Sequence, residues 1–391
     1  MGCNLKNLPP PESPEQKWFS RLEYNEYRLI RKAQESGAFI AGLYCEYAPF
    51  ELVVAAGGIP VCLCGYSNEM IAPAESVLPS NLCPLIKSSF GYFLTDEHPF
   101  FTDSDVIIAE TTCDGKKKMF ELLSRKLGKE VFLLELPQSQ VSERSRNEWR
   151  SEIARLWEYL CERYKVPPAG REERLRQAIR LMNSERRAFT DFFDLGAHKP
   201  SPIGWAQQLM VRPHIRGQKQ FVDKLNKLTA EYRAKITHGD LPAKEGPRVL
   251  VTGVPIGMGS HKVLETIEDA GGRVVVQENC NGYKPQYVLA DECAPPLEAI
   301  ADKYLAIPCS CMTPNDERIR LLDRLIREFH VDAVVELVWQ ACHTYNVEAH
   351  FIAAAVKEMG KPYLKIETDY SPSDREQIRL RVESLLDMVR R

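Results

Sequence analysis

The sequence predicts an α/β protein made of two doubly wound parallel-sheet lobes, flavodoxin- or Rossmann-like, joined by a helical segment. Apolar runs of four to six residues alternate with helical patterns up to residue 141 and again after residue 242, which is typical of buried parallel strands with crossover helices. The stretch between them is Arg-rich and carries apolar residues at helical spacing. We therefore expect an N-terminal α/β lobe with a helical arm at 1–141, a helical connecting segment at 142–241 and a C-terminal α/β lobe at 242–391.

In the first lobe, four short apolar runs predict strands, and two longer amphipathic patterns predict helices. The strands are expected at 38–44, 60–64, 105–109 and 131–134. One helix is expected at 49–56, before Gly57, and another at 116–127, before Gly128. Glycine commonly ends a helix because it adopts the left-handed conformation without strain.

The connecting segment predicts helices whose apolar faces are marked by Ile153, Leu156, Trp157 and Leu160, and then by Leu175, Ile179 and Met182. A Pro-bounded linker is expected at 242–247. The second lobe predicts strands at 248–253, 273–277, 304–307, 331–338 and 362–366. Its helices are expected at 261–270, 314–329 and 347–359, and Thr313 is positioned to cap the second of them.

Composition excludes several classes of protein. The 391 residues are 44% hydrophobic and carry a net charge of −3, so general disorder and a general nucleic-acid binder are not expected. No run of about 18 apolar residues occurs, so we expect no transmembrane helix. The polar, Pro-rich stretch 1–14 lacks the apolar core of a secretory signal, and Lys6 stands where a myristoylation motif has Ser or Thr. We expect a cytoplasmic protein with a small-molecule substrate and neither a membrane nor a nucleic acid as partner.

The chain has twelve cysteines, an unusual number for a cytoplasmic protein. Structural disulfides are not expected in a reducing compartment, which leaves metal ligands, catalytic thiols or buried thiols. Six of them lie near the ends of predicted elements, three in each lobe: Cys45, Cys83, Cys113, Cys280, Cys309 and Cys342. Five follow a predicted strand within a few residues, whereas Cys83 lies in a turn-rich stretch. Since ligands of open α/β sheets bind at the carboxyl ends of the strands, these cysteines can converge on one site.

Thiolates are soft ligands that favour zinc or iron–sulfur clusters. Structural zinc sites usually have closely spaced cysteine pairs such as C-x₂-C, and none occurs here. An iron–sulfur cluster is larger and can be held by loops from distant segments. Spacing alone leaves open that the six are buried thiols. Packing is the simpler interpretation for Cys3, Cys62, Cys64, Cys161 and Cys293, and Cys311 competes with Cys309 for one ligand position.

At these residues the chain resembles the 2-hydroxyacyl-CoA dehydratase and benzoyl-CoA reductase superfamily. The resemblance rests on YCEYAPFEL at 44–52, AAGGIPV at 55–61, TTCD at 111–114, QACHTY at 340–345 and GKPYLKIETDY at 360–370. It runs from about residue 15 to the end of the chain and is weakest in the helical middle.

The resemblance implies iron–sulfur chemistry. In the dehydratases, each such subunit holds one 4Fe–4S cluster on three cysteines, which here would be Cys83, Cys113 and Cys342. In the double-cubane cluster proteins, two cubanes are bridged by a sulfide, and the additional cysteines correspond to Cys45, Cys280 and Cys309. Because all six are present, the chain looks closer to that branch. The branch implies an anaerobic homodimeric reductase that receives low-potential electrons from an ATP-hydrolysing iron–sulfur activator.

Some charged residues next to the predicted ligands are candidates for supporting roles. Lys116, Lys117 and Lys118 follow Cys113 and could offset cluster charge or contact the activator, although a solvated lysine run is the simpler interpretation. Possible proton donors beside the ligand loops, each of which could equally be structural, are Glu46, Glu110, Glu278 and His343.

Three alternatives stay open. One is a dehydratase subunit with a single 4Fe–4S cluster, and another is a non-catalytic electron-transfer or cluster-carrier protein. The third is a dinucleotide-binding oxidoreductase, suggested by the glycines Gly257 and Gly259 after a strand. The dinucleotide fingerprint needs a third glycine, and Lys262 stands in its place.

Overall fold

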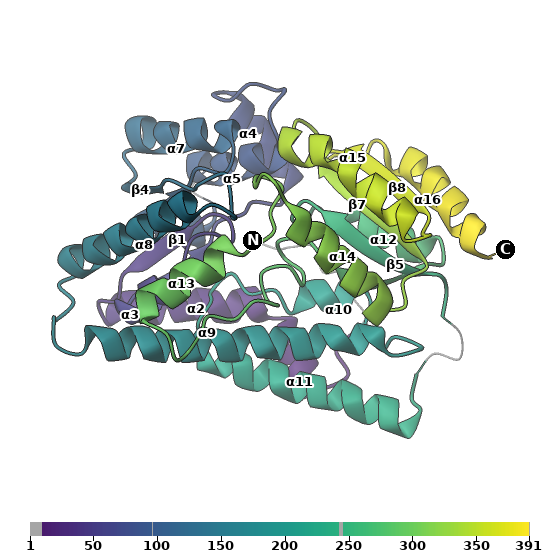
Figure 1. The fold of residues 1–391 in the computed structure, drawn as a ribbon, viewed down its shortest axis with the longest axis horizontal. Coiled ribbons are helices and arrows are strands. Elements are labelled where there is room, and N and C mark those ends of the chain that lie inside the picture. Colours follow the sequence, from purple (N-terminus) through teal and green to yellow (C-terminus); the bar gives the residue numbers. More distant parts are fainter. Residues whose placement is uncertain (1–9, 96, 242–244, 391) are drawn as a thin grey trace.

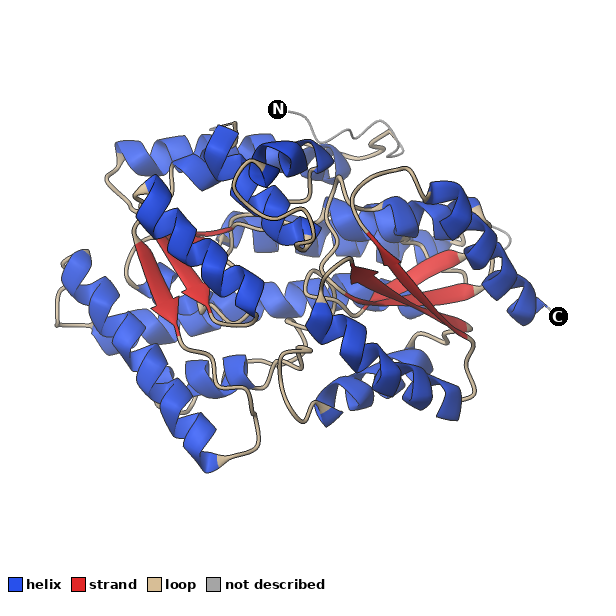
Figure 2. Ribbon diagram, turned by 90° about the horizontal axis from the view of Figure 1, so that it is seen from above, coloured by secondary structure: helices blue, strands red, loops and turns tan. Residues whose placement is uncertain are grey.

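The computed structural model describes residues 10–95, 97–241 and 245–390, in which the chain forms two parallel sheets of four strands. The first sheet has the order β2-β1-β3-β4, made of Ile59–Cys62, Ile40–Leu43, Val106–Glu110 and Val131–Leu134. The second has the order β6-β5-β7-β8, made of Arg273–Gln277, Arg248–Gly253, Ala333–Trp339 and Tyr363–Thr368. Figure 2 shows the sheets as two separate groups of strands with helices around each. The predicted fold class is confirmed.

Helices cover both sheets and connect them (Figure 1). In the first lobe they are α1 (Pro14–Phe19), α2 (Leu22–Glu35), α3 (Phe50–Ala55), α4 (Ile71–Glu75), α5 (Pro84–Thr95), α6 (Pro99–Thr102) and α7 (Asp114–Leu127), with a 3-10 turn η2 (Asn68–Met70). The connecting helices are α8 (Glu143–Arg163), α9 (Arg171–Phe193), η3 (Asp194–Ala197), α10 (Trp205–Met210) and α11 (Lys219–His238). Those of the second lobe are α12 (Lys262–Asp269), α13 (Pro296–Leu305), α14 (Asp316–Glu328), α15 (His343–Glu358) and α16 (Arg375–Arg390).

Local sequence signals explain several helix boundaries. Gly128 follows α7 with φ 64° and Gly239 follows α11 with φ 76°, the left-handed conformation that glycine adopts without strain. The hydroxyl of Ser142 accepts a hydrogen bond of 3.1 Å from the N–H of Ser145 and caps α8. None of the described helices combines the length and apolar composition that a bilayer-spanning segment needs.

Two expectations were wrong. The run 304–307 is no strand, because Tyr304 and Leu305 form the last turn of α13, whose buried residues recur at helical spacing. A short apolar run fits either a strand or a buried helix end, and the preceding residues decide between them. Thr313 does not cap α14, whose N-cap is Asn315; the Thr313 N–H donates instead to Gln138 O at 2.8 Å. The features expected at 1–9, including Cys3, and the linker residues 242–244 lie outside the described residues.

Helix α13 is encoded between two strands of the second lobe but packs in the first. Ile300 belongs to the same buried cluster as the core of the first sheet and Trp149 of α8. The indole N–H of Trp149 donates to Ala301 O at 3.1 Å, and the Tyr47 hydroxyl donates to Ile307 O at 2.7 Å. These contacts hold the segment after α13 against the loop that follows β1.

A buried charged cluster fastens α13 to α3 and α9. The guanidinium of Arg186 pairs with Glu51 at 2.7 Å and donates to the Tyr304 hydroxyl at 3.2 Å, and the Tyr304 hydroxyl donates to Glu51 at 2.8 Å. The Arg186 and Glu51 side chains are 2% and 0% exposed, so neither charge is solvated. Burial of an ion pair is tolerated only when both partners are present.

We expect Arg186→Met to lower the free energy of unfolding by about 3–5 kcal/mol, because the Glu51 charge would remain buried without a partner. Arg187→Met is the matched control: the neighbouring Arg187 is 54% exposed and pairs with the half-exposed Glu292, so its loss should cost less than about 1 kcal/mol. Urea unfolding of both variants followed by circular dichroism measures the difference. Equal losses would show that the buried cluster does not stabilise the fold.

Candidate functional site

The loops that carry the predicted cysteines leave the two sheets at their carboxyl ends. Cys45 and Cys113 follow β1 and β3, the two central strands of the first sheet, and Cys342 follows β7 of the second. In each sheet, the chain order reverses between its two central strands, and ligands of doubly wound folds bind at this position. Cys280 follows β6, whereas Cys83 precedes α5 and Cys309 follows α13.

Cys83, Cys113 and Cys342 form one set of thiols, which we call the first sulfur group. The Cys83 thiol accepts a hydrogen bond from Cys342; this contact lowers the pKa of Cys83 and raises the pKa of Cys342. Cys113 is close enough to interact electrostatically with both. The group therefore joins two cysteines of the first lobe to one of the second.

Each member of the first sulfur group stands at the N-terminus of a helix. The carbonyls of Cys83, Cys113 and Cys342 accept the first helical hydrogen bonds of α5, α7 and α15, at 3.1, 3.0 and 3.0 Å. N–H groups of the first turns interact with the three sulfurs. Helix N-termini stabilise negative charge, so three helices favour thiolates at this point.

Cys45, Cys280 and Cys309 form a second sulfur group. Their thiols interact electrostatically with one another, and burial raises the pKa of both Cys45 and Cys280. The Tyr345 hydroxyl lies 3.7 Å from the Cys280 sulfur and 4.0 Å from the Cys309 sulfur. A hydrogen bond from the Cys311 thiol lowers the pKa of Cys309 to about 5. No helix begins at any of these three cysteines, so side chains hold this group.

Lys116 lies between the two sulfur groups. Its ammonium pairs with the fully buried carboxylate of Glu110 and interacts with Cys45 of the second group and Cys113 of the first. It also lies 5.8 Å from the ring centroids of Tyr44 and Phe120. Lys117 and Lys118 are 42% and 78% exposed and pair with acidic residues on their own helix. Of the three predicted lysines, only Lys116 therefore faces the thiols.

Two non-glycine residues in these loops have left-handed backbones. Cys45 has φ 57°, and Ala341, which precedes Cys342, has φ 61°. Side chains disfavour this conformation, and such residues concentrate at functional sites where the surroundings enforce them. The loops after β1 and β7 are thus shaped around their cysteines at some cost in backbone energy.

The four possible proton donors differ in their surroundings. Glu46 is buried beside Cys280 and Cys309, interacts with the Cys280 thiol, and burial raises its pKa to about 7. Glu110 pairs with Lys116, and Glu278 pairs with Lys284 at 3.3 Å, so both have structural partners. His343 is exposed at the start of α15. Of these four, Glu46 is the one that is buried in the site and has no ion pair among the described residues.

The remaining cysteines lie at varying distances from the site. Cys311 contacts Cys309, and Cys64 interacts with the backbone N–H of Cys45 and with Lys116, so both border the second sulfur group. Cys62 lies near Arg216 and Glu185 instead. Cys161 is buried in α8, and Cys293 is exposed.

Sequence reasoning missed three side chains that face the thiols: Tyr345, Lys284 and Arg212. Tyr345 stands in the QACHTY motif, three residues after Cys342, but nothing in the spacing indicates that it reaches Cys280 and Cys309. Lys284 is fully buried and donates to the Tyr345 hydroxyl at 2.9 Å. Arg212 interacts with Glu46 and Cys280, and one of its guanidinium nitrogens has no partner among the described residues.

The glycine-rich turn after β5, which partly resembles a dinucleotide-binding fingerprint, serves the packing between the two lobes. A Cβ on Gly257 would lie 2.2 Å from the Tyr66 ring, so the turn makes room for an aromatic side chain of the first lobe. Asn281 donates to the Tyr66 hydroxyl and to Ile256 O, both at 2.7 Å. The turn therefore joins the lobes beside Cys280.

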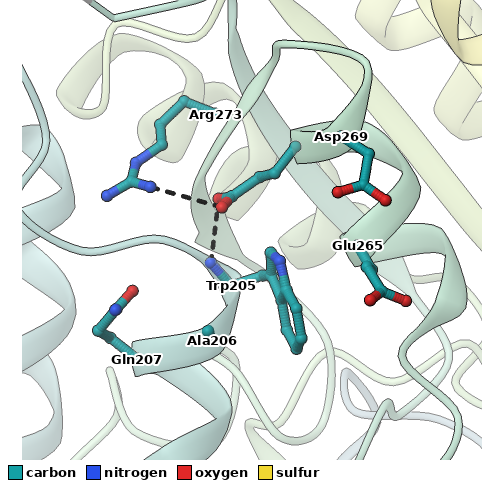
Figure 3. A pocket seen from close by; sticks show the side chains of 7 residues that line it. Trp205, Ala206, Gln207, Glu265, Asp269 and Arg273 are labelled. Atoms are coloured by element: carbon teal, nitrogen blue, oxygen red, sulfur yellow. Dashed lines mark hydrogen bonds and ion pairs between the residues drawn. The ribbon is translucent and has the colours of Figure 1, made fainter. Parts of the chain in front are cut away.

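Two further observations concern single metal ions and a hollow elsewhere in the protein. Among the residues that the structure describes, no group of three or more His, Cys, Asp or Glu side chains is arranged to hold a single metal ion. A hollow of about 550 Å³ between α10, α12 and β6 contains none of the predicted residues (Figure 3). There Glu268 accepts from the backbone N–H of Trp205 at 3.1 Å and pairs with Arg273 at 3.4 Å, while Glu265 and Asp269 pair with Arg375 of α16, so the charged groups of the hollow have partners in the protein.

Fold and site together define a two-lobed α/β protein with a partly buried, sulfur-lined centre where the lobes meet. Residues 45–389 match the family described as 2-hydroxyglutaryl-CoA dehydratase, D-component. The chain belongs to this family.

Relatives span nearly the whole chain. The protein YjiM of Escherichia coli (strain K12), provisionally named a dehydratase subunit, is 41% identical over 375 residues, which cover 95% of this chain and 97% of YjiM. The (R)-phenyllactyl-CoA dehydratase beta subunit of Clostridium sporogenes is 22% identical over 92% of this chain and 94% of its own length. The (R)-2-hydroxyglutaryl-CoA dehydratase subunit beta of Acidaminococcus fermentans is 20% identical over 95% and 98%. The predicted superfamily is confirmed.

We expect Lys116→Met to destabilise the metal-free protein by about 3 kcal/mol, because the fully buried Glu110 would lose its cation. Lys118→Met, on the same helix, removes a cation that is 78% exposed and should change the free energy of unfolding by less than about 0.5 kcal/mol. Chemical unfolding under reducing conditions gives both values. A Lys116→Met protein as stable as Lys118→Met would mean that Lys116 does not neutralise Glu110.

Proposed function

We propose that the chain is an iron–sulfur enzyme whose six cysteines, Cys45, Cys83, Cys113, Cys280, Cys309 and Cys342, hold a double-cubane cluster between the two lobes. It would use low-potential electrons from an ATP-hydrolysing iron–sulfur activator to reduce a small, hard-to-reduce substrate. The observation that supports the proposal is that six thiols from the two lobes lie together in two adjoining groups. Tyr345 and Lys116 each interact with both of these groups. The predicted cytoplasmic location and homodimer belong to the same proposal.

The residues around the thiols fit such a cofactor. The donor set is all sulfur, which suits iron–sulfur clusters and gives three thiolates per cubane. Buried polar atoms without a hydrogen-bond partner are rare in proteins, yet two lie beside the thiols when the described residues are considered: one carboxylate oxygen of Glu110 and one guanidinium nitrogen of Arg212. A bound polar group at this position would account for them.

The protein's own residues would set the conditions for electron transfer. A thiolate-bound iron–sulfur cluster supplies single electrons at a potential that its surroundings tune. Helices α5, α7 and α15 stabilise negative charge on the first sulfur group, while Tyr345 and Lys116 do so around the second. The burial of Glu46 keeps a proton available at its carboxyl near neutral pH, close to Cys280 and Cys309. Substrate reduction requires such a proton source.

A second candidate function is that of a 2-hydroxyacyl-CoA dehydratase subunit with one 4Fe–4S cluster on Cys83, Cys113 and Cys342. It is favoured by the relatives described above, two of which are named as beta subunits of 2-hydroxyacyl-CoA dehydratases. In this case the second sulfur group would be free thiols beside a single cluster. The two candidates differ in iron content and in electron consumption.

Iron and acid-labile sulfide counts after anaerobic reconstitution test the cluster. We expect about eight irons per chain, and about four in either Cys113→Ala or Cys280→Ala, because each variant removes a ligand from one of two cubanes. Cys161→Ala, which removes a buried thiol of α8 far from the site in sequence, should keep the full count. About four irons in the wild type, none in Cys113→Ala and no change in Cys280→Ala would favour the single-cluster dehydratase. A wild type without iron would contradict both candidates.

The number of electrons consumed per product molecule distinguishes a reductase from a dehydratase. Removal of water from a 2-hydroxyacyl-CoA is redox-neutral overall, so a dehydratase should form many product molecules per electron supplied. A reductase consumes two electrons for each product. We expect no enoyl-CoA from (R)-2-hydroxyglutaryl-CoA when activator, ATP and reductant are supplied, measured by chromatography against reductant consumed. Enoyl-CoA formed in large excess over electrons would establish the second candidate. Cluster reoxidation that no substrate accelerates would indicate a non-catalytic electron carrier.

A further inference from the structure

Tyr345 is in contact with both sulfur groups. It lies in the first turn of α15, and only 4% of it is exposed. Its backbone N–H interacts with the Cys342 sulfur of the first group. Its hydroxyl, at the other end of the side chain, lies 3.7 Å from the Cys280 sulfur and 4.0 Å from the Cys309 sulfur of the second group. One residue therefore spans the distance between the two groups.

The direction of the hydrogen bonds at the Tyr345 hydroxyl follows from its partners. The Lys284 ammonium lies 2.9 Å from the hydroxyl oxygen and can only donate, so this oxygen accepts. The single hydroxyl hydrogen is then available for one of the two sulfurs. The hydroxyl is thus a donor aimed at the second sulfur group and held there by Lys284.

A rigid, buried network fixes this donor. Lys284 pairs with Glu278 at 3.3 Å, and Thr252 donates to Glu278 at 2.5 Å. The guanidinium of Arg318 lies 4.9 Å from the Tyr345 ring centroid and donates to Thr252 at 2.8 Å. The side chains of Lys284, Glu278 and Arg318 are fully buried, and Arg318 also pairs with Glu336 at 3.2 Å, so these side chains are linked in one network and cannot move independently.

We propose that Tyr345 is a positioning residue that fixes the second sulfur group relative to the first and donates its one hydroxyl hydrogen bond to the thiolate of either Cys280 or Cys309. Hydrogen bonds to ligand sulfur stabilise the more negative, reduced state and raise the reduction potential. The effect on potential rests on the proposed function, whereas the effect on the position of the loops is a property of the chain itself.

The first test uses metal-free protein and Tyr345→Phe, which keeps the ring and removes only the hydroxyl. Hydrogen exchange followed by mass spectrometry should show about 3- to 10-fold faster exchange in the loops at 278–284 and 307–311, the loss expected for one hydrogen bond. The control is Tyr232→Phe, which removes the hydroxyl of a buried tyrosine in α11. Unchanged exchange in both loops of Tyr345→Phe would overturn the positioning role.

The second test measures reduction potentials of the iron-loaded protein by EPR-monitored titration. In Tyr345→Phe, one midpoint should become more negative, whereas Tyr232→Phe should match the wild type. Replacement of Tyr345 by 3-fluorotyrosine, a near-isosteric stronger donor that preserves the fold, should shift the same midpoint in the opposite direction. Iron-loaded variants with wild-type midpoints would overturn the donor role alone. A wild type that binds no iron would overturn it together with the proposed function, while the exchange experiment would still decide the positioning role.

Discussion

The packing of α13 against the first lobe is the contact on which the site depends. This helix leaves the second sheet after β6, crosses to the first lobe and is fastened there by Trp149, Tyr47 and the buried Arg186–Glu51 pair. The chain then returns to the second sheet through Cys309. Without this excursion, Cys309 would remain in the second lobe, away from Cys45. The two lobes are therefore interlocked, and the second sulfur group exists only in the complete chain.

Charge compensation is the second requirement of this interior. Glu110, Glu278, Glu336, Lys284 and Arg318 are all without solvent exposure, and each has an oppositely charged partner. A buried charge without a partner costs several kcal/mol, which explains why these residues occur as linked pairs and not singly. Glu46 and Arg212 are the contrast, because both lie beside the thiols and neither has an ion pair among the described residues. They mark the part of the interior that the polypeptide alone does not satisfy.

Much of the fold could be predicted from the sequence, because buried parallel strands have continuous apolar runs, and Gly128 ends a helix where the pattern stops. The helix end at Tyr304 was not predictable in this way, since four apolar residues fit a strand equally well. Cys45, Cys113, Cys280 and Cys342 could be singled out by their position after strands, whereas Cys83 precedes a helix and Cys309 follows one, and the division of the six into two groups could not be predicted. That division depends on α13, which crosses from the second lobe to the first, and on Tyr345. The spacing of residues in the sequence does not indicate that the Tyr345 side chain extends to Cys280.

The two sulfur groups are held by different means, and this difference has a consequence for the family. The first group depends on the backbone: three helix N-termini meet at Cys83, Cys113 and Cys342, and any sequence that keeps these helices keeps their dipoles. The second group depends on side chains, chiefly Tyr345 and Lys284, which a single substitution can remove. Members of one fold can therefore keep the first group and lose the second without any change in architecture. Residues around Cys280 and Cys309, not the sheets, are where such proteins should diverge in chemistry.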